Sequence, residues 1–259
     1  MVSSLPNHAA LSQPSHSIEW IAPKDAAALA PATSAGWTRA LIADLRNPAI
    51  LPLLRPAPLP GDYADEARPG ASDRSYFLAR RALLRSLVAL SLGCNADDVQ
   101  IRYDAPGAPK VIAPKFLAHF STCHLSVSGR GAIAALAVSS HPVGIDIEPL
   151  GAHVEIIADV LDHAEQAYLA SLPLASAQHT FLRIWTAKEA WLKARGIGLN
   201  AEPAQLRIEA REQTLARAFE QGAPCVPLAG EWVEREFESM PLIASCVTLP
   251  EATIAPPQD

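Results

Sequence analysis

Short apolar segments joined by tight turns constrain the fold of this chain more than any other feature. The segments HLSVS and GAIAALAVS are separated only by the turn Gly129-Arg130-Gly131, and VQIRYD and PKVIAP flank the turn APGAP. Such connections suit antiparallel hairpins and are too short for a helical crossover between parallel strands. We therefore expect antiparallel sheets rather than an alternating βαβ sheet.

Helical segments alternate with these hairpins. Apolar residues recur at three- and four-residue intervals over 72–93 and again over about 179–195, and a glycine ends each pattern. A shorter helix begins at Asp162, and strand-like segments follow at 206–209 and 242–248. This order predicts an α+β fold with two lobes and a ligand cleft between them.

A proline-rich segment precedes the first long helix. Proline fixes φ and removes a backbone donor, so we expect residues 46–70 to form an extended surface loop rather than a helix or a central strand. We divide the chain into three parts. Residues 1–71 are an N-terminal extension packed on the first lobe, residues 72–140 are the core of the N-terminal lobe, and residues 141–259 are the C-terminal lobe.

Composition excludes several classes of protein. A hydrophobic fraction of 49% supports a packed core, and a formal charge of -6 argues against a general nucleic-acid binder. Neither a secretion leader nor a stretch of about 18 apolar residues is present, so we expect a cytoplasmic protein that does not bind membranes. The four cysteines lack zinc-site spacing, and we expect reduced, mostly buried thiols.

The segment VGIDIE contains the first candidate for chemistry. On a strand, Asp146 and Glu148 project from the same face while Ile145 and Ile147 point into the core. Two adjacent carboxylates repel each other, and a hard divalent cation such as Mg²⁺ removes that repulsion. A pair of solvated acids on an edge strand is the alternative, and the pair taken alone favours it.

A second candidate lies in WTAKEAWLKARGIGL. Glu189 and Lys193 are four residues apart and share one helical face, a spacing that alone indicates a surface ion pair. Trp185, one turn earlier, draws this face partly inward, where charges without a role are costly. The two segments together supply three carboxylates and the lysines Lys188 and Lys193, so we predict a magnesium site for phosphoryl chemistry.

The two segments together resemble the signature motifs of Sfp-type 4'-phosphopantetheinyl transferases, G-[IV]-D-[IV]-E and W-x-x-K-E-A-x-x-K-x-x-G-x-G-L, at the family's separation of about 40 residues. FLARRALLRSLVALSLG also resembles the family's first long helix. The resemblance implies a monomer with two similar α/β lobes related by a pseudo-twofold axis and coenzyme A between them. It also implies transfer of phosphopantetheine to a serine of an apo acyl, peptidyl or polyketide carrier protein, with release of 3',5'-ADP.

The resemblance further implies roles for individual residues. Asp146, Glu148 and Glu189 would hold magnesium or manganese on the pyrophosphate of coenzyme A. Lys193 would contact a phosphate and is, with Glu189 and Glu165, one of three expected catalytic residues. Either Glu189 or Glu165 would help to deprotonate the carrier serine. The residues expected to bind coenzyme A are Arg81, Lys110, Ser126, Ser128, Lys188 and Lys193.

Two of these residues have structural alternatives. Asp162 and Glu165 have the spacing of a helix N-cap and its capping-box partner, which would give Glu165 a purely structural role. Arg81 fits a phosphate contact from the first helix, and a solvated arginine is the alternative.

The sequence also departs from the family pattern at two places. Val127 stands where family members often have a histidine between two serines, and G-A-P with Lys110 after it replaces G-K-P. Both changes remove a donor aimed at the 3'-phosphate end of coenzyme A. A second interpretation is therefore a transferase-derived protein that binds carrier proteins or coenzyme A with little catalysis. The retained carboxylates Asp146, Glu148 and Glu189 count against it.

Overall fold

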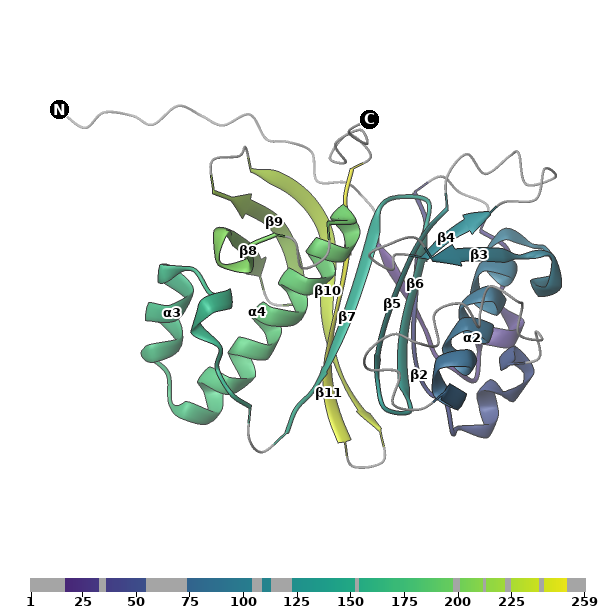
Figure 1. Cartoon of the computed structure of the whole chain (residues 1–259), viewed down its shortest axis with the longest axis horizontal. Helices are drawn as coiled ribbons and strands as arrows, with labels where there is room; N and C mark the ends of the chain where they lie inside the picture. The colour runs from purple at the N-terminus through teal and green to yellow at the C-terminus, as the bar shows by residue number, and fades with distance from the viewer. Residues whose placement is uncertain are drawn as a thin grey trace.

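Two sheets face each other at the centre of the structure, and helices cover their outer sides (Figure 1). The computed structural model describes residues 17–32, 36–54, 74–103, 109–112, 123–151, 154–197, 201–211, 213–221, 225–237 and 240–250. Helices and sheets are segregated into layers, which confirms the predicted α+β class.

The first sheet has six strands among the described residues, in the order β1-β2-β6-β5-β4-β3. Their bounds are β1 Ile18–Ile21, β2 Thr38–Asp44, β3 Gln100–Tyr103, β4 Pro109–Ile112, β5 His124–Arg130 and β6 Ile133–Ser139. β1 runs parallel to β2, and the other pairings are antiparallel. Helix α2 (Arg74–Leu92) packs on the outer face and shares an apolar core with this sheet.

The second sheet has five strands among the described residues, in the order β7-β11-β10-β9-β8. Their bounds are β7 Val143–Pro149, β8 Leu206–Arg211, β9 Thr214–Glu220, β10 Val226–Phe237 and β11 Met240–Thr248, all paired antiparallel. Helix α4 (Leu174–Arg195) covers its outer face, and the shorter α3 (His163–Ala170) packs against α4. The second sheet and α4 enclose a core of their own.

Strands β5 and β7 join the two sheets. The backbone N–H of Ile145 in β7 donates to Ser126 Oγ in β5 at 3.0 Å, and Ser128 Oγ in β5 donates to Asp146 Oδ1 in β7 at 2.8 Å. Ile145 and Ile147 are fully buried in the apolar layer between the sheets, as the alternation of VGIDIE predicts. The interface between the sheets therefore combines an apolar layer with polar contacts along one pair of strands.

Short 3₁₀ helices connect several elements: η1 Ala26–Ala28, η2 Pro48–Leu54, η3 Ala96–Asp98, η5 Ala158–Val160 and η7 Pro203–Gln205. Helix η2 corrects part of the expected loop over 46–70, whose residues from 55 onward lie outside the described ranges. Ile50 and Leu53 of η2 are buried against the first core, three residues apart on one side of the turn. Burial of these two side chains stabilises a short helix despite the prolines.

Several boundaries differ from those expected. Helix α4 begins at Leu174, five residues before the predicted start, with Pro173 at its N-cap. Gly93 and Gly196 end α2 and α4 with φ of 69° each, in the left-handed conformation that glycine adopts most easily. Strands β1, β2, β9 and β10 were not predicted.

The cysteines are all free, but only Cys246 is buried; Cys225 is exposed and the other two are partly exposed, so the expectation of mostly buried thiols was wrong. Among the described residues, no helix is both long enough and apolar enough to cross a membrane.

Gly144 allows α4 to lie directly on β7. A Cβ atom at this position would be 1.7 Å from the carbonyl oxygen of Ala190 in α4, well inside van der Waals contact. The helix backbone therefore occupies the space that any other side chain would need. The glycine of VGIDIE thus sets the distance between the two elements that carry the motifs.

We expect Gly144→Ala to lower the free energy of unfolding by about 3 kcal/mol or more, because α4 has to move away from β7. Urea denaturation of the purified protein measures this loss. Gly151→Ala is the matched control, since a Cβ there meets no atom within 4 Å. Equal stability of the two variants would contradict close packing at Gly144.

Candidate active site

The charged residues of the two motifs meet where β7 lies beneath α4. Side chains alternate along a strand, so Asp146 and Glu148 follow Gly144 on the side of β7 that faces α4. The facing side of α4 carries Trp185, Glu189 and Lys193 at four-residue intervals. The two motifs, far apart in sequence, thus form one cluster of charged groups.

Asp146 is at the centre of this cluster and is only 2% exposed. Its Oδ1 accepts hydrogen bonds from Ser128 Oγ at 2.8 Å and from Lys193 Nζ at 2.6 Å. Its Oδ2 is buried and has no hydrogen-bond partner in the described structure. A buried carboxylate oxygen without a partner is costly, so this atom is a candidate ligand for a cation.

Glu189 lies beside Asp146 and is also partly shielded from solvent. Burial raises the pKa of the Glu189 carboxyl, and the charge of Asp146 raises it further, while Lys193 opposes the shift. Its Oε1 is buried without a hydrogen-bond partner in the described structure. Two neighbouring carboxylates thus each keep one buried oxygen available.

Glu148 is held by one residue of the first sheet and one residue of α4. Arg130, the last residue of β5, donates from Nε to Glu148 Oε2 at 2.9 Å and from Nη2 to Glu148 Oε1. Trp185 Nε1 donates to the same Oε1 at 3.3 Å. The hydrogen bond and charge of Glu148, together with the charges of Asp146 and Glu189, raise the pKa of Arg130.

Arg130 is a site residue that the sequence analysis missed. It was assigned to a turn, but the structure pairs Arg130 with Ile133 as the last rung of the β5–β6 hairpin. Its position two residues after Ser128 was the available signal, since alternate residues of a strand share one side. Extending the strand by this residue would have placed it with the serines.

The carboxylates suit a hard divalent cation but do not form a ready site. Among the described residues, no three acidic, histidine or cysteine side chains lie close enough together to hold a metal ion. The available donors are carboxylate oxygens, which Mg²⁺ prefers, and the partnerless oxygens of Asp146 and Glu189 fit that role. Glu148 is turned instead toward Arg130.

Lys188 forms a separate cluster with Glu165. Its ammonium group is fully buried and donates to Glu165 Oε2 at 2.6 Å, to Val160 O at 2.8 Å and to Pro203 O at 2.9 Å. Glu165 Oε2 also accepts from Asp162 N, and Asp162 Oδ1 accepts from Glu165 N, so the predicted capping box is present. Burial raises the pKa of Glu165 and lowers that of Lys188. All three ammonium hydrogens of Lys188 have acceptors, which leaves none for a phosphate.

The remaining residues expected to bind coenzyme A lie in the first sheet and in α2. The hydroxyls of Ser126 and Ser128 are engaged with β7, and Val127 packs against the core beneath α2. Arg81 of α2 is 4% exposed and stacks on Tyr103, with its guanidinium carbon 3.6 Å from the ring centroid. Arg81 is therefore not the solvated arginine of the alternative interpretation. Lys110 is exposed on β4.

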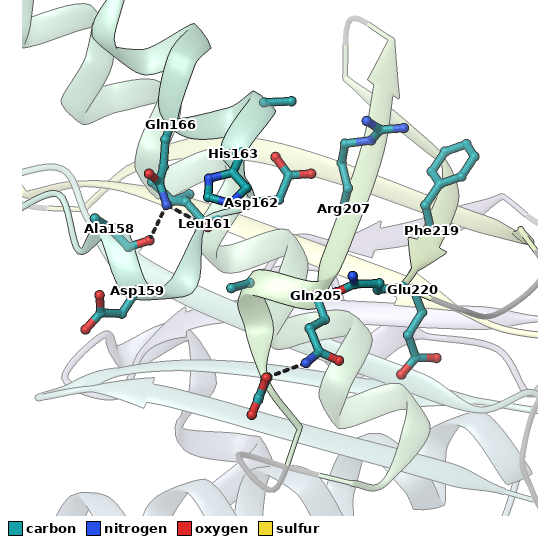
Figure 2. Close-up of a pocket in the computed structure, with 14 residues that line it drawn as sticks. Ala158, Asp159, Leu161, Asp162, His163, Gln166, Gln205, Arg207, Phe219 and Glu220 are labelled. Atoms are coloured by element: carbon teal, nitrogen blue, oxygen red, sulfur yellow. Dashed lines mark hydrogen bonds between the residues drawn. The ribbon is translucent and has the colours of Figure 1, made fainter.

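A pocket of about 650 Å³ lies between the start of α3, η7 and strands β8 and β9 (Figure 2). Its charged lining is mainly acidic, with Asp159, Asp162, Glu202 and Glu220 against Arg207 and His163. The motif carboxylates are not among its lining residues. An acidic wall does not suit the phosphates of coenzyme A, so we assign this pocket no part in binding it.

Comparison with known proteins identifies the family. A sequence model of the 4'-phosphopantetheinyl transferase superfamily matches residues 142–230, from the start of β7 into β10. A 4'-phosphopantetheinyl transferase of Bacillus pumilus is 30% identical over 167 residues, which cover 60% of this chain and 69% of that protein. The chain belongs to this superfamily.

Two cyanobacterial members of the superfamily match over a shorter stretch. The 4'-phosphopantetheinyl transferase HetI of Nostoc sp. is 34% identical over 129 residues, which cover 49% of this chain and 54% of HetI. A putative 4'-phosphopantetheinyl transferase of Synechocystis sp. is 29% identical over 132 residues, which cover 49% of this chain and 52% of that protein. The chain thus spans about half the length of these two relatives.

We expect Lys188→Met to lower the free energy of unfolding by about 3–5 kcal/mol, because Glu165 is left buried without its partner. In the double variant with Glu165→Gln the loss should be smaller, since glutamine keeps the cap without a charge. Urea denaturation of the single and double variants measures the coupling. Unchanged stability of Lys188→Met would contradict this structural role, and loss of coenzyme A affinity by the folded variant would support a phosphate contact.

We expect Glu189→Gln to stabilise the metal-free protein at neutral pH. The raised pKa of Glu189 means that folding favours its protonated form. The resulting stabilisation is fully present below the ordinary pKa of 4.5 and is lost as the pH rises through the folded-state pKa. A neutral glutamine avoids this loss, so its advantage should disappear below pH 4.5. Thermal unfolding in EDTA across this range is the measurement. An advantage independent of pH would point to packing rather than charge.

Proposed function

We propose that this protein transfers the phosphopantetheine group of coenzyme A to a serine of an apo carrier protein and releases 3',5'-ADP. The observation that carries the proposal is the pair of buried carboxylate oxygens on Asp146 and Glu189, which have no partner among the described residues and lie near the ammonium group of Lys193. The superfamily model covers all three of these residues, and the relatives that match over this region are named as 4'-phosphopantetheinyl transferases.

Asp146, Glu148 and Glu189 are the residues that would hold a divalent cation, magnesium or manganese. When bound, such an ion supplies Lewis-acid stabilisation of the negative charge on the pyrophosphate. The surrounding residues fix the ligands before any substrate arrives: Ser128 and Lys193 orient the Asp146 carboxylate, and Trp185 orients Glu148.

Lys193 is proposed to bind a phosphate of coenzyme A. Among the described residues its ammonium group has two acceptors, Asp146 Oδ1 at 2.6 Å and Ile145 O at 3.2 Å, so a third hydrogen is available for a phosphate oxygen. The side chain is 27% exposed, in contrast to that of Lys188. Lys193 would therefore neutralise charge on the leaving 3',5'-ADP while holding Asp146 in place.

Glu189 is the better candidate for the group that accepts the proton of the carrier serine. Its Oε1 has no hydrogen-bond partner among the described residues, so a carboxylate oxygen is available to accept a proton. Glu165 is less suitable, because its Oε2 accepts from both Lys188 and the Asp162 N–H. We propose that Glu165 instead caps the N-terminus of α3 and neutralises the buried charge of Lys188.

Coenzyme A is proposed to extend from this cluster toward the first sheet and α2. Lys110 and Arg81 would contact its 3'-phosphate end there. Strands β1 and β2 belong to the first sheet, which supports packing of residues 1–71 on the lobe formed by residues 72–140. Residues 141–259 would then form the second lobe with the metal and catalytic motifs. We further propose a cytoplasmic monomer acting on acyl, peptidyl or polyketide carriers.

Intact-mass spectrometry of an apo acyl and an apo peptidyl carrier protein, each incubated with this protein, coenzyme A and Mg²⁺, tests the proposal. We expect a gain of one phosphopantetheine group on at least one carrier. Glu148→Gln and Glu189→Gln should each lower the rate about 100-fold or more, because each removes a charge that holds the cation. EDTA should abolish the reaction.

Glu236→Gln is the matched control, since Glu236 is exposed on β10 and should leave the rate unchanged. Binding of coenzyme A or a carrier without any mass gain would overturn the transferase proposal and favour the docking function. A mass gain that persists in both active-site variants would overturn the assignment of the residues.

A further inference from the structure

Arg130 forms a two-point hydrogen-bonded ion pair with Glu148, and the two side chains differ in exposure. Nε and Nη2 of the guanidinium each donate to a different oxygen of the Glu148 carboxylate. The side chain of Arg130 is 45% exposed, whereas that of Glu148 is 14% exposed. Glu148 is therefore fixed within the structure, and the arginine reaches it from the solvent side.

Among the described residues, Arg130 and Lys193 are the two cations bound to the motif carboxylates. Asp146, Glu148 and Glu189 contribute three negative charges, against two positive charges from Lys193 and Arg130. Lys193 is 27% exposed and bound to the buried Asp146, so it is held more firmly within the site than Arg130. Arg130 is the more exposed of the two positive charges, at 45%, so it is the one that can move away into solvent.

We propose that Arg130 takes the place of the divalent cation at Glu148 in the metal-free protein and turns to the pyrophosphate of coenzyme A when the cation binds. This inference rests on the proposed function. A guanidinium engaged with both oxygens of Glu148 reduces their availability as ligands, and its charge repels an incoming cation. Binding of the ion and release of Arg130 are therefore coupled.

Two features suit Arg130 to this exchange. Trp185 Nε1 donates to Glu148 Oε1 independently of the arginine, so the carboxylate keeps its orientation after the arginine leaves. The planar fork that matches a carboxylate matches a phosphate equally well. The same side chain could thus pair with Glu148 when no cation is bound and with phosphate oxygens when one is.

Titration of the full-length protein with Mn²⁺, followed by electron paramagnetic resonance without coenzyme A, tests the exchange. Arg130→Gln should bind Mn²⁺ about 10-fold or more tightly than the wild type, because a competing positive charge is gone. Arg130→Lys should stay close to the wild type. Arg235→Gln is the control, since Arg235 is an exposed residue whose Nη1 contacts the carbonyl of Glu234, and its Mn²⁺ affinity should not change.

A second titration, with inorganic pyrophosphate on the Mn²⁺-saturated protein, tests the other half of the exchange. Arg130→Gln should bind pyrophosphate about 10-fold more weakly, the value of one charge-assisted hydrogen bond. Unchanged or weaker Mn²⁺ binding by a folded Arg130→Gln variant would overturn the exchange, and unchanged pyrophosphate binding would overturn the turn to phosphate. Equal Mn²⁺ binding by the wild type and Asp146→Asn would overturn the metal site, and with it both proposals.

Discussion

The packing of α4 against β7 at Gly144 is the constraint on which the site depends. No side chain separates the strand from the helix backbone at Ala190, so the next residues along each element are brought within hydrogen-bonding reach. Lys193 then contacts Asp146, and Trp185 contacts Glu148, each as a consequence of strand and helix periodicity. A wider spacing would leave the same residues present but not in contact.

Two lysines of one helical motif have different surroundings because they lie on different sides of α4. Lys193 faces β7 and keeps part of its side chain in solvent, while Lys188 is enclosed by α3, η5 and η7. The buried lysine links three chain segments through their carbonyl and carboxylate oxygens. In this chain the motif thus contains a fully buried lysine and, five residues later, a partly exposed one, and sequence alone does not separate their surroundings.

Much of the fold follows from periodicity and glycine signals, whereas several contacts do not. The long helices, the hairpins and the capping box at Asp162 were predicted from patterns within about twenty residues. Strands β1 and β2 were missed because their pairing joins distant segments and their burial comes from the assembled sheet. Arg130 was missed because the predicted strand ended too early to include it. The burial of Lys188 depends on three segments that are distant in sequence, so no local pattern could predict it.

The two serines of β5 fix the position of this strand along β7. Each side-chain oxygen bonds to a successive residue of the partner strand, so a shift of β5 by one position would place the apolar side chain of Val127 where Asp146 now finds a hydroxyl. An insertion or deletion between the two serines would therefore break at least one of these contacts.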